Sequence, residues 1–438
     1  MKMQALLRYR EFDILELQKS LMKKVGEGYK SFKLTMANGK AVVARIPNPN
    51  AGPAVSTTAS EVATMDFLRN MHHLAVPEVL AWNSAIDSTN RVSAEYIIME
   101  YAPGKSLADV WTDMELEHKV QTMEDIVAIQ HELLSLRFSK VLHEHKNSIA
   151  EKFSIGPIVD TAFWSKGRDD MDIDRGPCFG REIAWIQKHA TPRSPNDPLF
   201  VSHSWNNPAE HVSLLQRYLS VAPHLVSREV DILGSFLWHS DLRTPNIFVN
   251  DTGHITSIID WQSTRAGPLF LEGRHPHLLD YNGDLILELP ESFKQQDENM
   301  QTAIKDKVTK SVLLYLYEKY TAERNPLLCR VFRYSNGKTL TDSIRFVGNT
   351  WEGDILPLRE SLIRVQKKWD FLGHTARCPV DFSPEEIRKH HEDGEGWNEV
   401  QDFWDTSKIM GRDGWTSHAT YDQAISIYSQ IQAEAASH

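Results

Sequence analysis

Cysteine is scarce in this sequence: 438 residues contain three, at Cys178, Cys329 and Cys378. They lie far apart and none belongs to a C-x-x-C pair, which excludes a disulfide framework and a zinc site built on cysteine. A protein without disulfides suits a reducing compartment. Acidic residues follow the first basic residues of the chain at once, unlike in a mitochondrial presequence, so we expect a cytoplasmic protein.

Long apolar runs and clusters of basic residues are also missing. No stretch has the roughly 20 apolar residues that a transmembrane helix needs, so we expect no membrane span. The formal net charge is −11, and no run of lysine and arginine offers a nucleic acid a binding surface. With 41% hydrophobic residues, the chain is long enough for two lobes or domains of a globular protein.

Hydrophobic periodicity predicts the secondary structure on either side of a central stretch. Alternating residues indicate a strand at 31–36, β-branched residues indicate one at 41–46, and an apolar centre indicates a buried strand at 94–101. Helical periodicity indicates helices at 12–22, 58–72, 297–324, 351–371 and 421–433, and a long buried helix through 123–134.

The central stretch, Leu237–Trp261, has the pattern of a β-hairpin. Two apolar runs, at 247–249 and 255–259, flank Asp251-Thr252-Gly253, and an Asp and a Gly in so short a gap are typical of a tight turn. We interpret Asp251 as a turn residue. Because a hairpin returns the chain on itself, residues just outside its two ends come close together.

Polar side chains lie at those two ends. Asp241 and Asn246 precede the hairpin, and Asp260 follows it. Carboxylate and amide oxygens around one point suit a hard cation and a phosphate. Phosphoryl transfer needs the same set, since one carboxylate receives a hydroxyl proton while an Asn and an Asp hold Mg²⁺.

The chain has the motif H-x-D-x-x-x-x-N and, after the hairpin, two hydrophobic residues that are followed by Asp260 and Trp261. This combination resembles the motifs of the aminoglycoside and choline phosphotransferase family. Protein kinases share the Asp-to-Asn spacing but continue from the metal-binding Asp with Phe-Gly, so Trp261 favours the small-molecule branch. The sequence after it, through Pro268-Leu269-Phe270, is similar to a fungal subgroup related to altered-inheritance-of-mitochondria proteins. That association makes the mitochondrion the alternative compartment.

The resemblance implies an α+β, two-lobed, protein-kinase-like fold. Residues 1–101 would form a small nucleotide-binding lobe, with an antiparallel sheet and one helix, and residues 75–82 would be a strand of that sheet. Residues 102–438 would form a large, mainly helical lobe with the catalytic loop, the metal site and the acceptor pocket. The implied activity is transfer of the γ-phosphate of ATP, or of GTP, to a hydroxyl group of a small molecule, with Mg²⁺. Neither the acceptor nor the oligomeric state follows from the sequence.

Within that family pattern each motif residue has an implied role. Asp241 would be the base, and Asn246 and Asp260 would hold Mg²⁺. Arg243 would face the transferred phosphoryl group and stabilise its charge. His239 supports the loop by hydrogen bonds.

Residues of the small lobe would bind the nucleotide. Gly26 and Gly28, followed by Ser31, occupy the place of a phosphate-binding loop, where glycine lets backbone N–H groups approach phosphate. Arg45 takes the place where the family often has Lys, and it can grip phosphate with two N–H groups. Backbone groups from Glu100 to Ala102 would form the hinge that contacts the base.

Glu61 has two interpretations. Thr58-Ala59-Ser60-Glu61 has the form of a capping box, in which Glu61 caps its own helix. Glu61 also shares a helix face with Met65 and Leu68, and a carboxylate on a buried face needs a cation, for which Arg45 is the candidate. By resemblance this would be the strand–helix ion pair that nucleotide binding requires.

Three functions are compatible with these residues. A small-molecule kinase is favoured by the complete set of Asp241, Asn246 and Asp260. A catalytically inactive nucleotide-binding relative or scaffold that acts through partners is the alternative, and Arg45 in place of Lys supports it. A metallohydrolase is disfavoured, because the histidine pairs at 72–73 and 390–391 have no carboxylate or cysteine partners at metal-binding spacing.

Overall fold

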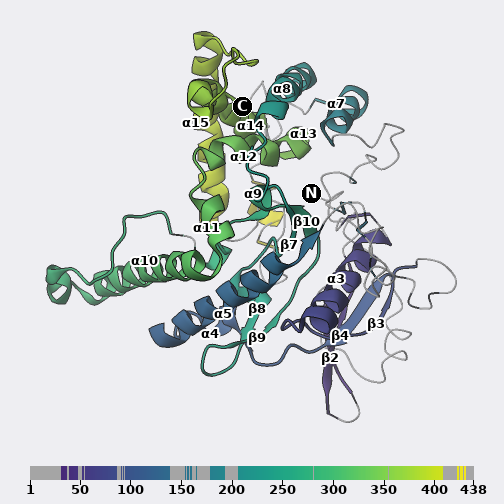
Figure 1. The fold of residues 1–438 in the computed structure, drawn as a ribbon, viewed down its shortest axis with the longest axis vertical. Helices are drawn as coiled ribbons and strands as arrows, with labels where there is room; N and C mark the ends of the chain where they lie inside the picture. The colour runs from purple at the N-terminus through teal and green to yellow at the C-terminus, as the bar shows by residue number, and fades with distance from the viewer. Residues whose placement is uncertain are drawn as a thin grey trace. The chain divides into compact units, whose positions relative to one another are not determined.

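The computed structural model describes residues 31–138, 178–192, 206–353 and 355–407, apart from positions 37–38, 48–51, 54, 86–89, 91, 93 and 280. It also describes a few separate positions between 153 and 164 and between 422 and 430. Of these residues, those up to 164 and those in 228–335 form one compact unit, and those in 165–227 and from 336 onward form another. The expected fold class is confirmed: a small antiparallel sheet is combined with a larger helical region (Figure 1).

The small sheet has four antiparallel strands in the order β1-β2-β4-β3. Its strands are β1 (Ser31–Thr35), β2 (Ala41–Arg45), β3 (Val79–Asn83) and β4 (Tyr96–Glu100), close to the predicted ranges. Leu34, Val42 and Ile98 point into a core of their own, because alternate residues of a strand share a face. Arg45, the last residue of β2, pairs with Ile97 in the centre of the sheet.

Helix α3 (Ser56–His72) lies against this sheet (Figure 1). Met65 and Leu68 pack into a core that also contains Ile97 from β4 and Trp261 from the central stretch. The capping-box prediction is wrong: the helix begins at Ser56, two residues before Thr58, and its first turn has no side-chain cap. Thr58 instead donates to the carboxylate of Glu95, and Glu61 faces inward.

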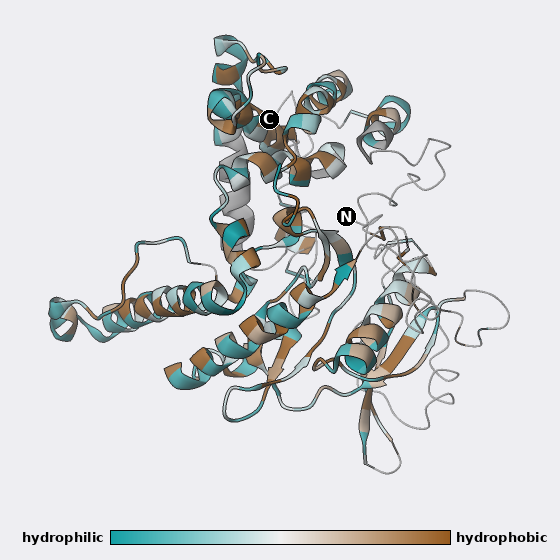
Figure 2. Ribbon diagram, viewed as in Figure 1, coloured by the Kyte–Doolittle hydropathy of each residue, from teal (hydrophilic) through white to brown (hydrophobic). Residues whose placement is uncertain are grey.

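The predicted hairpin is confirmed as β8 (Ile247–Val249) and β9 (Ile255–Ile258), joined by a turn through Asp251 to Gly253. Strand β5 (Lys105–Ser106) pairs with β8, and α4 (Leu107–Val110) follows it. The hairpin packs on α5 (Leu116–Ser135), which carries both teal and brown residues in Figure 2, as a helix with one buried face should.

Strand β7 (Ser235–Trp238), which leads into the central stretch, is the middle strand of a three-stranded sheet. Strands β6 (Arg137–Phe138) and β10 (Arg265–Pro268) flank it, both antiparallel. The same unit contains α9 (Leu269–Glu272), α10 (Glu298–Arg324) and α11 (Pro326–Phe332). Helix α10 matches the prediction within one residue, and Asp297 caps it by accepting from the N–H of Met300.

The other unit is helical in its described parts. It contains α7 (Cys178–His189), α8 (Pro208–Val221), α12 (Gly337–Phe346), α13 (Thr350–Gly353), α14 (Ile355–Lys368) and α15 (Pro384–Ser407). Arg359 on α14 is 8% exposed and contacts Glu210 of α8 at 3.0 Å and Asp393 of α15 at 3.5 Å, which ties three helices together. The helix predicted at 351–371 is divided among α13, α14 and a short 3₁₀ turn at Trp369–Leu372.

Two predicted helices cannot be compared. Residues 12–22 lie outside the described residues, and so do most of residues 421–433. None of the helices in the described parts of the chain combines the length and hydrophobicity that a membrane span requires. The predicted boundary between lobes at residue 101 lies inside the unit that holds the sheet and the hairpin, and it stays a prediction.

Candidate functional site

The two ends of the central hairpin meet at the candidate site. The N–H of Ile259 donates to the carbonyl of Asn246 at 2.9 Å, so Asn246 and Asp260 lie beside each other across the end of the hairpin. The N–H of Ile258 donates to the carbonyl of Ala75 at 2.7 Å and attaches β9 to the segment before β3. Asp260 has a φ of +66°, a left-handed conformation that a non-glycine residue adopts at a cost.

Asn246 and Asp241 are joined directly. The side-chain amide of Asn246 donates from Nδ2 to the carbonyl of Asp241 at 2.9 Å and to its carboxylate Oδ2 at 3.1 Å. Asn246 is only 5% exposed, so the atoms packed around it restrict the rotation of its side chain. An amide NH₂ group only donates, so the carbonyl oxygen is the atom that Asn246 can offer to a cation, and the hydrogen bonds to Asp241 orient it.

Arg243 lies on the other side of Asp241. Its Nε is 2.8 Å from Oδ2 of Asp241, and the two side chains are 56% and 34% exposed. Oδ2 therefore accepts a hydrogen bond from Asn246 and forms an ion pair with Arg243, and both contacts restrain the carboxylate. The second oxygen, Oδ1, is the one that can receive a proton from a ligand.

His239 supports the loop, as predicted. Its Nδ1 accepts from the N–H of Asp241 at 3.1 Å, and its Nε2 contacts the carbonyl of Ile259 at 3.0 Å. A ring that accepts at Nδ1 donates at Nε2, so these partners favour the neutral form. Burial lowers the pKa of His239 below its ordinary value and favours the same form. The ring also meets Trp261 edge to face at 4.6 Å, and Trp261 is buried in the core that contains Met65.

Arg45 connects the small sheet to this site. Its Nη1 donates to Glu61 on α3, and its Nη2 donates to Asp260 at 2.7 Å and to Gln262 at 2.6 Å. The predicted ion pair with Glu61 is therefore present. The contact with Asp260 joins residues from β2, α3 and the end of the hairpin in one cluster.

Burial and charge compete in this cluster. Burial lowers the pKa of Arg45, but the carboxylates of Glu61 and Asp260 outweigh it and hold the pKa above its ordinary value. Burial raises the pKa of Glu61, and the opposing charge of Arg45 offsets only part of that rise. Arg45 therefore stays protonated, and its positive charge interacts with both carboxylates.

The donor set fits Mg²⁺ held jointly by protein and phosphate. Asp260 supplies a carboxylate and Asn246 a carbonyl oxygen, and Mg²⁺ is usually bound by one or two carboxylates together with waters and substrate phosphates. Within the described ranges no group of three histidine, cysteine or acidic residues is arranged to hold a metal alone. Around the site three carboxylates, of Glu61, Asp241 and Asp260, outnumber two guanidinium groups, which also suits a cation.

The predicted nucleotide-binding residues are only partly described. Gly26 and Gly28 lie outside the described residues, and Ser31 is the exposed first residue of β1. The N–H of Glu100 donates to the carbonyl of Glu78 at 2.8 Å, so it is committed to the sheet. A base at this hinge would have to use other backbone groups, such as the carbonyl of Glu100 or the N–H of Ala102.

The sequence patterns did not identify Gln262 as a residue of the site. It accepts from Arg45 beside Asp260, yet a single glutamine after the Asp-Trp pair gives no signal by itself. Asp125 on α5 was also missed, and it contacts the turn of the hairpin. Both are acceptors whose partners are distant in sequence, so local patterns could not reveal them.

Known proteins resemble this chain over most of its length. A subtelomeric hrmA-associated cluster protein of Aspergillus fumigatus is 31% identical, over 94% of this chain and 92% of its own. Altered inheritance of mitochondria protein 9, mitochondrial, of Yarrowia lipolytica is 23% identical, over 91% of this chain and 75% of its own. A solved structure of an amicoumacin kinase is 12% identical with a TM-score of 0.40, covering 88% of this chain and 100% of its own. No family model matches the chain.

Proposed function

The chain belongs to the fungal protein family that includes the subtelomeric hrmA-associated cluster protein of Aspergillus fumigatus, and we propose that it is a small-molecule kinase. The reaction is transfer of the γ-phosphoryl group of ATP, or of GTP, to a hydroxyl group of a small acceptor, with Mg²⁺. An amine acceptor is less favoured. The proposal rests on the chain's own residues, because the names of its relatives state no activity.

One observation carries the proposal: Arg45 bridges Glu61 and Asp260. Phosphoryl transfer depends on positioning and on neutralising the charge of the phosphates. The bridge places a fixed cation from the small sheet next to the proposed metal-binding carboxylate. A guanidinium group has five N–H donors, so Arg45 can keep its carboxylate partners and still donate to a phosphate oxygen.

Asp241 is the proposed base. Its carboxylate accepts the proton of the acceptor hydroxyl while the oxygen of that hydroxyl bonds to the γ-phosphorus and the bond from that phosphorus to the bridging β–γ oxygen breaks. ADP leaves with the electron pair of the broken bond. Asn246 donates to Oδ2 of Asp241, so Oδ1 takes the proton. Arg243 is exposed enough to turn from Asp241 toward the phosphoryl group.

Asn246 and Asp260 are the proposed ligands of Mg²⁺. When bound, Mg²⁺ supplies positive charge that neutralises the phosphate oxygens. Asn246 is oriented by its hydrogen bonds to Asp241, and Asp260 by Arg45. Both ligands are therefore held by neighbouring residues before any cation binds, which improves metal affinity.

The alternative is a nucleotide-binding relative without transfer activity. Arg45 supports it, because the family often has Lys at this position and the guanidinium group here already contacts three acceptors. The two functions differ at Asp241. A kinase needs the Asp241 carboxylate, whereas a protein that only binds nucleotide does not.

Thermal unfolding of the purified protein with ATP and with GTP, each with and without Mg²⁺, tests the nucleotide site. We expect a rise in melting temperature that requires Mg²⁺ and disappears in Asp260→Ala, as ligand linkage demands above the Kd. Asp251→Ala, on the turn of the same hairpin, is the matched control and should keep the rise. If no nucleotide shifts the wild-type protein, the proposal is wrong and a scaffold is favoured.

Release of ADP in the presence of a panel of hydroxyl compounds tests the transfer. Asp241→Asn should abolish release and keep the Mg²⁺-dependent thermal shift. If ATP binds with Mg²⁺ and no release above the Asp241→Asn background occurs with any acceptor, the binding alternative replaces the kinase.

The compartment is a separate proposal. The name of the Yarrowia lipolytica relative places that protein in mitochondria, so we propose the mitochondrion in place of the cytoplasm expected from the sequence. Cell fractionation with a C-terminal tag tests it, and recovery of the protein in the cytosolic fraction alone would reverse it.

A further inference from the structure

We propose that Asp125 on α5 is a positioning residue, which holds the turn of the β8–β9 hairpin and thereby sets where Asn246 and Asp260 lie. The inference rests on the proposed function, because it concerns the same metal ligands. Asp125 itself touches none of the proposed catalytic or metal-binding groups.

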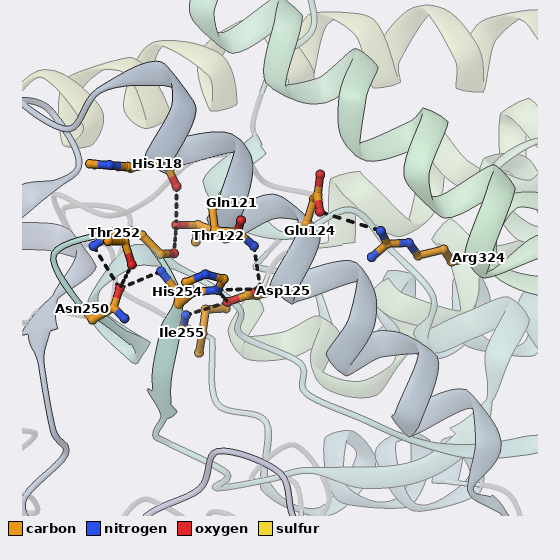
Figure 3. Close-up of polar contacts among 11 residues, drawn as sticks. His118, Gln121, Thr122, Glu124, Asp125, Asn250, Thr252, His254, Ile255 and Arg324 are labelled. Atoms are coloured by element: carbon orange, nitrogen blue, oxygen red, sulfur yellow. Dashed lines mark hydrogen bonds and ion pairs between the residues drawn. The ribbon is translucent and has the colours of Figure 1, made fainter.

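The Asp125 carboxylate contacts two residues at the end of the turn (Figure 3). Its Oδ2 accepts from the backbone N–H of Ile255 at 2.8 Å and lies 3.2 Å from Nδ1 of His254. Gln121, one turn earlier on the helix, donates from Nε2 to Oδ1 of Asp125 at 3.1 Å. Two adjacent residues of the hairpin are thus attached to one side chain, and Gln121 orients that side chain from its own helix.

Two further contacts bring the same turn onto α5. The Thr122 hydroxyl lies 2.7 Å from the carbonyl of Gly253 and 3.0 Å from the carbonyl of His118. Gly253 approaches so closely that an added Cβ would lie 2.3 Å from the carbonyl oxygen of His118. Because only glycine permits this approach, the sequence of the turn and the surface of α5 are matched to each other.

The hairpin is short, and its strands are paired and buried, so we expect its turn and its ends to move together. Ile247 pairs with Ile258 and Val249 with Ile255, and the side chains of Ile247, Val249 and Ile258 are at most 2% exposed. From Ile255 to Asp260 the chain spans roughly 16 Å at the usual rise of an extended strand. A tilt at the turn therefore displaces Asn246 and Asp260, and ligand groups tolerate only about 0.5 Å of displacement.

The neighbour of Asp125 provides a matched control. Glu124 pairs with Arg324 of α10 at 3.7 Å and makes no contact with the hairpin among those in Figure 3. Both residues are acidic, adjacent and on α5, so a loss of charge or of helix stability should affect them alike. Only the substitution of Asp125 releases the turn.

The experiment measures the Mg²⁺ concentration that gives half-maximal ATP binding, by calorimetric titration of the full-length protein. Asp125→Ala should raise that concentration about tenfold or more, the effect expected when a group that orients metal ligands is lost. Asp125→Asn keeps an acceptor for the N–H of Ile255 and should stay near the wild-type value. Glu124→Ala should not change it.

The outcomes separate this inference from the proposed function. If the wild-type protein binds no nucleotide with Mg²⁺, the proposed function is wrong and the inference is wrong with it. If the wild-type protein binds and Asp125→Ala needs no more Mg²⁺ than Glu124→Ala, only the inference is overturned. A lower melting temperature of Asp125→Ala with an unchanged Mg²⁺ requirement would show that Asp125 serves stability alone and would also overturn it.

Discussion

Nη2 of Arg45 donates to Oδ1 of Asp260 at 2.7 Å across 215 residues of sequence. The same guanidinium group holds Glu61, which is 3% exposed. Arg45 therefore has two functions, because it compensates a buried carboxylate and orients a proposed metal ligand. The two functions can be separated by experiment, since one affects the free energy of unfolding and the other affects the binding of Mg²⁺.

Arg45→Met should destabilise the protein strongly. The substitution leaves Glu61 buried without its cation, and breaking a buried ion pair costs about 3 kcal/mol or more. Urea unfolding at pH 7 measures the change. Lys105→Met is the control, since Lys105 pairs with Asp251 on the surface, and its loss should change the unfolding midpoint little. Equal midpoints for the two variants would show that the Arg45 pair contributes no more than a surface pair.

Sequence patterns predicted the elements around the site better than the contacts between them. The hairpin followed from its apolar runs and turn residues, and the Arg45–Glu61 pair followed from the helix face that Glu61 shares with Met65. The capping box failed because Thr58 lies inside the helix and bonds Glu95, which lies 37 positions away. The capping pattern contains no information about a partner so distant.

The acceptors that complete the site could not be predicted for a related reason. Gln262 and Asp125 are ordinary polar residues in their local sequences, and each acquires its role from a partner in another element. A side-chain direction across 130 or more positions depends on the packing of whole elements, which periodicity does not report.

Arg243→Ala should slow transfer and leave stability almost unchanged. The Arg243 side chain is 56% exposed, and substitutions at such positions usually change the free energy of unfolding by less than about 0.5 kcal/mol. Loss of a cation at the transferred phosphoryl group lowers kcat by about 100-fold or more. Steady-state ADP release with an identified acceptor gives kcat, and thermal unfolding gives the stability. A variant with wild-type kcat would remove Arg243 from the proposed machinery.

Acid should destabilise the protein through His239. Because burial lowers the pKa of this imidazole in the folded state, the unfolded chain binds its proton more readily. Its contribution to stability is complete above the ordinary pKa of 6.5 and is lost progressively as the pH falls below that value. Protonation at Nδ1 would also remove the acceptor of the N–H of Asp241.

The melting temperature of wild-type protein between pH 5 and 8 measures this effect. His239→Gln should reduce the fall below pH 6.5 without abolishing it, because burial also lowers the pKa of His72 and of His390. His277→Gln removes an exposed imidazole and serves as the control. If His239→Gln follows the wild-type curve at every pH, His239 is not the group that titrates.

Gly253→Ala and Gly39→Ala form a pair that isolates the contact between the hairpin and α5. The two glycines have nearly the same positive φ, +82° and +79°. An added Cβ at Gly253 would meet the carbonyl of His118 at 2.3 Å, whereas at Gly39 it would have no described atom within 4 Å. Both variants bear the cost of a left-handed residue, about 1–2 kcal/mol, and only Gly253→Ala adds a collision with backbone.

We therefore expect Gly253→Ala to unfold at a lower urea concentration than Gly39→Ala and to need more Mg²⁺ for ATP binding. The collision cannot be relieved by a side-chain rotation, because the atom that the Cβ meets belongs to the backbone of α5. The turn must lift away from the helix, and the contacts of Thr122 and Asp125 weaken together. Equal Mg²⁺ requirements in the two variants would mean that the ends of the hairpin are held without its turn, by Arg45 and His239 alone.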